Sequence, residues 1–156
     1  MNILLLEDRG SRLYEIKEFL EDYGHIVYPC ESIYRANETW NKYKSNIDCA
    51  IIDLAMQPDG LKNPNDSESG YYSGWVFLQE NVFPDPNKPN FIGNCLILSA
   101  WVDSFKQYLT AKGKGGIIGE EQILSKNDHD IDNKLFKALE NIHKISNKRQ
   151  GTTNGV

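Results

Sequence analysis

Short apolar runs alternate along the chain with segments in which apolar residues recur at helical spacing. Continuous apolar runs of about four to eight residues are typical of strands that are buried on both faces of a sheet. Five such runs are present: NILLL (2–6), HIVYPC (25–30), IDCAIIDL (47–54), NCLILSA (94–100) and QILSK (122–126). Because Pro29 has no backbone donor, we expect the second run to be an edge strand.

The segments between these runs have the period of amphipathic helices. Ser11, Ser32 and Asp103 are placed to cap three of them, and Gly24 to end the first. The apolar pattern of residues 74–83 predicts a further short helix. The apolar faces are Leu13, Ile16, Phe19, Leu20 and Tyr23, then Ile33, Ala36, Trp40 and Tyr43, then Phe105, Tyr108 and Leu109, and finally Ile131, Leu135, Leu139 and Ile142. Strands that alternate with helices form parallel βαβ units, so the sequence predicts an α/β, doubly wound fold.

The connection after the third run is long for a compact domain. It reads QPDGLKNPNDSESGYYS, and we place an insertion within it at residues 59–73. The ending SNKRQGTTNGV has no apolar period, which is typical of a frayed or flexible segment. We therefore expect one domain over residues 1–145 and a flexible tail over 146–156, too short to hold a separate output domain.

Composition excludes several classes of protein. Seventeen basic against 22 acidic residues, a net charge of −5, argue against a nucleic-acid-binding surface. No stretch approaches the roughly 20 apolar residues of a membrane span. Cys30, Cys49 and Cys95 are far apart in apolar runs, which favours reduced core thiols over disulfides or zinc ligands. We expect a cytoplasmic protein.

Polar residues follow the apolar runs at the edge of the sheet where α/β proteins bind ligands. They are Glu7, Asp8, Asp53, Ser99 and Lys126. Taken singly, each is as typical of a helix cap or a solvated turn. Carboxylates that crowd together raise one another's pKa unless a cation neutralises them. An all-oxygen set of ligands with open positions suits Mg²⁺, so their shared edge predicts a magnesium site.

In this order the motifs resemble the receiver domain of two-component response regulators, the chemotaxis-type phosphoacceptor family. They are the acidic pair in ILLLED, the aspartate in AIIDLAM, the hydroxyl before a small residue in LILSA and the lysine in ILSK. The resemblance extends over residues 2–145. It implies a flavodoxin-like sheet of five parallel strands in the order 2-1-3-4-5, with helices on both faces.

The resemblance also implies roles for the acids. Asp53 would accept a phosphoryl group from a phosphohistidine of a histidine kinase or histidine phosphotransfer protein. Asp8 and Asp53 would bind Mg²⁺, with Glu7 near it and the backbone carbonyl of Ala55 as a further ligand. Such a protein catalyses at most its own phosphorylation and dephosphorylation, so it is not a conventional enzyme.

Lys126 and Ser99 would act on the transferred group. The lysine would screen the charge of the phosphoryl group, and the Ser99 hydroxyl would donate to one of its oxygens. The resulting movement would change the surface formed by the fourth helix, fifth strand and fifth helix, so that the output is a protein contact. Ala55 and Trp101 occupy positions that tune the lifetime of the phosphoryl group in this family. Trp101 would either cover the site or pack on the insertion.

Four features depart from the family pattern. Gln57 stands between Met56 and the expected proline, and Asn127 replaces the proline after the lysine. The insertion at 59–73 lengthens a connection that is usually short. Ile123 stands where the family has a switch aromatic, so the usual rotamer switch of that aromatic cannot operate here.

Two alternatives remain open. The missing aromatic and proline favour a phosphorylation-independent receiver-like interaction module, whereas the complete set of acids, hydroxyl and lysine favours a phosphoacceptor. A small-molecule-binding flavodoxin-like protein is disfavoured, because the strand ends carry acids rather than phosphate-binding glycines. The sequence identifies neither the kinase nor the output partner, and it leaves open whether two copies dimerise through the last helix.

Overall fold

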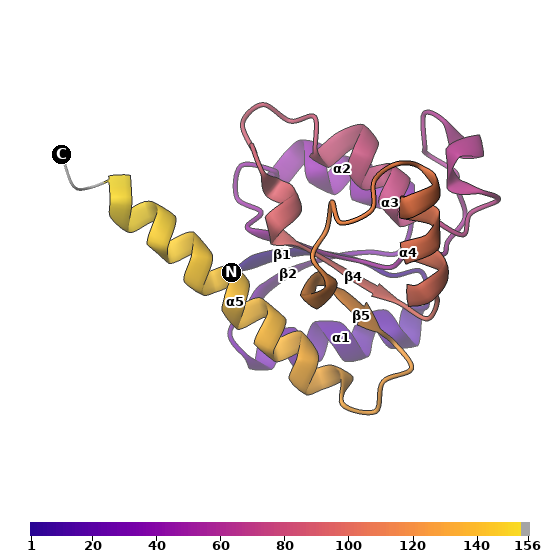
Figure 1. Cartoon of the computed structure of the whole chain (residues 1–156). Coiled ribbons are helices and arrows are strands. Elements are labelled where there is room, and N and C mark those ends of the chain that lie inside the picture. The colour runs from indigo at the N-terminus through magenta and orange to yellow at the C-terminus, as the bar shows by residue number, and fades with distance from the viewer. Residues whose placement is uncertain (154–156) are drawn as a thin grey trace.

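A five-stranded parallel sheet lies between two layers of helices in the computed structural model (Figure 1). The structure describes the backbone of residues 1–153 and the side chains of residues 1–145, 147 and 148. The strands are β1 (Asn2–Leu6), β2 (Ile26–Cys30), β3 (Cys49–Ile52), β4 (Cys95–Ser99) and β5 (Ile123–Ser125). Their order is β2-β1-β3-β4-β5, which confirms the predicted fold and places β2 at an edge.

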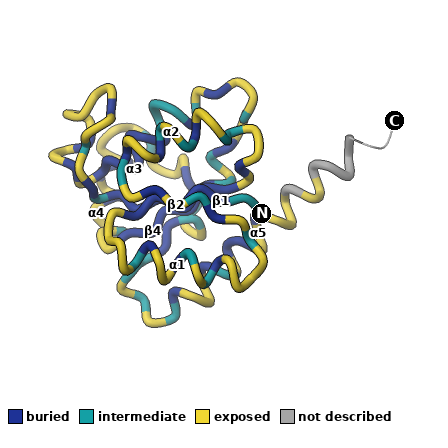
Figure 2. The backbone as a smooth tube through the Cα atoms, turned by 180° about the vertical axis from the view of Figure 1, so that it is seen from behind, coloured by how far each residue is buried: buried dark blue, intermediate teal, exposed yellow. Residues whose placement is uncertain are grey.

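Helices cover both faces of this sheet. The helix α1 (Gly10–Asp22) and the helix α5 (Ile131–Thr153) pack on one face, and α2 (Ile33–Tyr43), α3 (Ser73–Phe77) and α4 (Val102–Ala111) pack on the other. Successive residues of a strand point to opposite faces, so Ile3 and Leu5 join one apolar cluster while Leu4 and Leu6 join the other. Buried residues accordingly concentrate along the strands and the inner helix faces (Figure 2).

Two of the predicted helix caps are wrong, and one is confirmed. The Ser32 hydroxyl accepts the Arg35 backbone N–H at the start of α2. In contrast, α1 begins at Gly10 after Arg9, because the Arg9 N–H binds the Glu7 carboxylate and starts the turn before Ser11. The helix α4 likewise begins directly after Trp101, so Asp103 lies inside its first turn, where a carboxylate still interacts favourably with the helix dipole.

The remaining elements are short. The helix α3 continues into a single π turn (Leu78–Val82). The helix and the π turn together occupy most of the segment predicted as a short helix. Three-residue and four-residue 3₁₀ turns occur at Pro64–Ser67, Phe91–Asn94 and Glu120–Gln122.

The helix α5 extends beyond the body of the domain (Figure 1). It continues past residue 145 to Thr153, into the segment for which the sequence predicts a flexible tail. Residues 154–156 of that segment lie outside the described part of the chain. Within residues 1–153, no helix combines the length and the apolar character that crossing a membrane requires.

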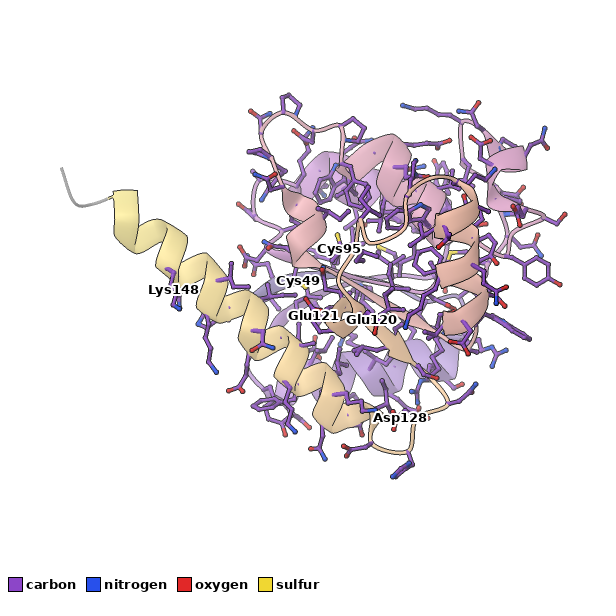
Figure 3. All side chains as sticks on the ribbon, viewed as in Figure 1. Cys49, Cys95, Glu120, Glu121, Asp128 and Lys148 are labelled. Carbon is purple, nitrogen blue, oxygen red and sulfur yellow. The ribbon has the colours of Figure 1, made fainter. Side chains whose placement is uncertain are left out.

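The three cysteines are buried core residues, as the sequence predicts. Cys49 and Cys95 lie within the body of the protein (Figure 3). Burial raises the pKa of the Cys30 thiol to about 11, which keeps it protonated at neutral pH.

Candidate functional site

The polar residues that follow the strands come together at one edge of the sheet. Two of them follow β1, one follows β3, one ends β4 and one follows β5: Glu7, Asp8, Asp53, Ser99 and Lys126. Backbone hydrogen bonds continue the sheet beyond the strand ends, because the Asp53 N–H donates to the Leu6 carbonyl and the Lys126 N–H donates to the Ser99 carbonyl. The side chains after the strands are therefore held at a common edge.

Lys126 bridges two buried carboxylates. Its Nζ lies 2.7 Å from Asp53 Oδ2 and 2.5 Å from Glu7 Oε2, and its side chain is only 14% exposed. Both carboxylates are almost fully enclosed. Removing one member of a buried ion pair leaves an uncompensated charge, so this lysine is electrostatically essential to the acids around it.

The three acids form a compact cluster of oxygen donors. One carboxylate oxygen each from Glu7, Asp8 and Asp53 lies within 4.8 Å of the others. Asp8 is exposed, so the cluster opens to solvent on its side. The cluster contains three carboxyl groups but only one ammonium, that of Lys126, so acidic groups are in excess. The donor type, the open side and the excess of acidic groups all fit Mg²⁺, which keeps several of its waters.

Asp53 has a perturbed pKa. Burial raises the pKa of its carboxyl to about 6; Lys126 opposes this shift, and the negative charges of Glu7 and Asp8 add to it. The carboxyl is thus mostly ionised at pH 7, yet a cation nearby would favour the ionised form further.

Gly74 allows the chain to fold back onto the end of β3, next to Asp53. A Cβ at this position would lie 1.9 Å from the Asp53 carbonyl oxygen, so no other residue fits without movement of the backbone. The Gly74 N–H also donates to the Leu54 carbonyl. The sequence identifies Gly74 only as the start of a helix, because a close backbone approach leaves no periodic signal.

Met56 joins the two ends of the long connection that follows β3. Its N–H donates to the Gly70 carbonyl, and its own carbonyl accepts the Ser73 hydroxyl at 2.8 Å. Gly70 has φ +93°, and a Cβ on it would lie 2.6 Å from the Met56 oxygen. The 59–73 segment is therefore a closed loop, a feature that sequence reasoning missed.

The 59–73 segment is also fixed to three helical elements. Tyr72 stacks on Tyr108 of α4 with ring centroids 4.1 Å apart. The Glu80 carboxylate accepts the N–H groups of Lys62 and Asn63. The Asn37 side chain of α2 donates to the Gly60 carbonyl. The predicted insertion is thus held by contacts with α2, with Glu80 and with α4.

The other predicted site residues lie around the strand ends of β4 and β5. The Ser99 hydroxyl is fully buried and accepts the Trp101 N–H at 3.0 Å, which leaves its own proton available to a further acceptor. Trp101 is 54% exposed. Ile123 is buried at the start of β5, opposite Ile97. The Asn127 N–H donates to the Ser125 hydroxyl at 3.2 Å, and its side-chain nitrogen lies 3.5 Å from the Ala100 carbonyl.

Comparison with known proteins gives matches among solved structures. No family model matches the sequence, and no curated protein matches it. A response regulator receiver domain protein from Clostridium thermocellum is similar with a TM-score of 0.63 and 23% identity, over 96% of this chain and 97% of that one. The receiver domain of the Francisella response regulator 1452 is similar with a TM-score of 0.60 and 19% identity, over 92% and 98%.

A third structure extends this result to a chemotaxis protein. Vibrio cholerae CheY4 is similar with a TM-score of 0.56 and 19% identity, over 90% of this chain and 97% of that one. In each comparison the likeness includes nearly the whole of both chains. The chain therefore has the fold of response regulator receiver domains.

Proposed function

We propose that the chain is a response regulator receiver that accepts a phosphoryl group on Asp53 and thereby changes its contacts with other proteins. The observation that carries this proposal is the ion pair of Lys126 with Asp53, inside a cluster of three acids at the ligand-binding edge of the sheet. The receiver fold supports the same function by analogy.

The reaction is a displacement at phosphorus. An Asp53 carboxylate oxygen attacks the phosphorus of a phosphohistidine, an O–P bond forms, the P–N bond breaks, and the electron pair stays on the imidazole nitrogen. Negative charge builds up around the transferred group, and Lys126 lies 2.7 Å from the nucleophile, where its ammonium neutralises part of that charge.

Mg²⁺ is the cofactor that this set of donors fits. Asp8 and Asp53 would hold it, with Glu7 near it and the Ala55 carbonyl as a further ligand. When bound, the ion neutralises the phosphoryl oxygens and the acids around them. Asp8 is the exposed member of the cluster, so exchange with solvent takes place on its side.

Ser99 connects the phosphoryl group with the surface. Its hydroxyl proton is free to turn toward a phosphoryl oxygen, and its oxygen is already bound to the N–H of Trp101, the residue that precedes α4. A movement of Ser99 is thus passed to the start of α4 without an aromatic at position 123. The partners would be a histidine kinase or phosphotransfer protein and an output protein that contacts this face.

The test is phosphorylation of the purified chain. With Mg²⁺ and a small phosphodonor, we expect a mass increase of one phosphoryl group, and with beryllofluoride a change in tryptophan fluorescence. Asp53→Asn abolishes both. Asp48→Asn is the matched control, because Asp48 precedes the same strand at the opposite edge of the sheet, and it leaves both intact. An unmodified native protein contradicts the proposal and favours the phosphorylation-independent interaction module.

A further inference from the structure

A small pocket lies beside the acidic cluster, between the site and the 59–73 segment. Its volume is about 200 Å³. Asp8 and Ala55 line it on the side of the site, and Ser69, Gly70 and Tyr71 line it on the side of the segment. The segment therefore forms one wall of a pocket beside Asp8, the exposed acid of the cluster.

This wall is a strained turn. Glu68, Ser69 and Gly70 have φ angles of 50°, 62° and 93°, so three successive residues are in the left-handed region, two of them not glycine. The buried Ser67 holds the turn, because its hydroxyl accepts the Gly70 N–H and donates to the Pro64 carbonyl. Strain of this kind persists only where surrounding contacts enforce it, and it is concentrated at functional sites.

Two adjacent tyrosines follow the turn, and their surroundings differ. Tyr72 is 8% exposed, stacks on Tyr108, and donates its hydroxyl to the Ser104 carbonyl. Tyr71 is 58% exposed and lines the same pocket as Asp8. Tyr72 therefore anchors the segment, whereas Tyr71 is an exposed residue of the pocket beside Asp8.

We propose that Tyr71 selects the phosphodonor by packing its ring against the imidazole from which the phosphoryl group departs. This inference rests on the proposed function of Asp53. The pocket is smaller than the roughly 300–1,000 Å³ of sites that enclose a whole small molecule, so it fits the end of a side chain. A histidine ring is flat and aromatic, and aromatic rings pair favourably with one another.

The contact acts on the leaving group alone. As the Asp53 oxygen bonds to phosphorus and the P–N bond breaks, the electron pair remains on the ring nitrogen. The ring departs as neutral imidazole when its other nitrogen carries a proton. Tyr71 exchanges no proton or electron in this step; its ring holds the imidazole in line with the attacking oxygen.

Three small donors test the proposal on the full chain with Mg²⁺. N-Phosphoimidazole carries the aromatic leaving group, phosphoramidate has a P–N bond without a ring, and acetyl phosphate has neither. In Tyr71→Ala we expect the rate of phosphorylation by N-phosphoimidazole to fall about two- to tenfold, the range of one aromatic pair, with the other two rates unchanged. Tyr71→Phe keeps the ring and therefore the native rates.

Tyr14→Ala is the matched control, because Tyr14 of α1 is 67% exposed and does not line the pocket. It leaves all three rates unchanged. An equal loss with all donors in Tyr71→Ala overturns the inference, since the residue then acts on the site as a whole, and so does the absence of any loss. A native protein that reacts with none of the donors contradicts the proposed function itself, a result distinct from both.

Discussion

The connections that follow β3 and β4 leave neighbouring strands at the same edge, yet they are held in opposite ways. The connection after β3 is closed on itself by Met56 and fastened to α4 through Tyr72. The connection after β4 enters α4 within two residues, and Trp101 in it is half exposed. The side of the site next to Asp53 is thus held by more contacts than the side next to Ser99.

This difference indicates which residues should move on phosphorylation. Tyr72 contacts both halves of α4, because its ring stacks on Tyr108 and its hydroxyl donates to the Ser104 carbonyl in the first turn. The first turn of α4 follows Trp101 and depends on the Ser99 hydroxyl. We infer that phosphorylation moves residues 99–101, which precede α4, more than the helix that Tyr72 holds.

The largest effect should come from closing the space at Gly74. In Gly74→Ala the new Cβ meets the Asp53 carbonyl, and we expect the free energy of unfolding to fall by about 3 kcal/mol or more. Gly93→Ala is the control, because nothing lies within 4 Å of a Cβ there. Denaturant unfolding measures both. Similar stabilities for the two variants would show that the connection after β3 can move enough to accommodate the new Cβ.

The second largest effect should come from removing the ring of Tyr72. Tyr72→Ala removes a buried ring from α4, and we expect a loss of about 3 kcal/mol. Trp101→Ala removes a half-exposed ring from the other connection, and we expect a change within about 0.5 kcal/mol. Equal losses in thermal or denaturant unfolding would contradict the contrast between the two connections.

The charge of Asp53 gives a pH dependence. Its pKa in the folded chain is about 6, above the ordinary value of 3.8, so the folded state binds the proton more tightly than the unfolded state. The stability that this carboxyl contributes is full below about pH 4 and is lost as pH rises through about 6. In metal-free buffer at pH 7.5, we expect Asp53→Asn to be more stable than the native chain by about 2–3 kcal/mol.

This advantage of Asp53→Asn should vanish in unfolding experiments near pH 4. It should also shrink when Mg²⁺ is added, because a bound cation stabilises the native chain and not the variant. An advantage that is independent of both pH and Mg²⁺ would show that burial does not perturb Asp53.

The smallest effect concerns the lifetime of the phosphoryl group. If Trp101 hinders the hydrolytic water, Trp101→Ala shortens the half-life of the phosphorylated chain about twofold or more. The measurement is loss of phosphoryl mass after removal of the donor. An unchanged half-life would mean that the exposed indole does not cover the site.

The sequence predicts most of the fold because burial on both faces of a parallel sheet leaves continuous apolar runs. The helix limits are predicted less accurately. Ser11 and Asp103 are plausible caps by residue type, but both lie inside helices that begin one residue earlier. The part of α5 after residue 145 is polar and has no apolar period, so the sequence does not indicate that the helix continues there.

The members of the candidate site could be found from the sequence because each follows a strand. The residues that hold the site in place could not be found in this way. Gly74 and Gly70 are needed where two backbones approach closely, and Tyr72 pairs with a residue of a helix far along the chain. Such contacts depend on how the connection after β3 folds in space, which neither spacing nor composition specifies.

The contact between Met56 and Gly70 has a consequence for how this protein can vary. Because the two residues are hydrogen bonded, residues 57–69 leave and re-enter the domain at a single point. Segments with adjoining ends can be shortened, exchanged or grafted with little disturbance of the scaffold that carries them. Residues 57–69 are therefore a replaceable module, which can diverge while the acidic cluster beside it stays the same.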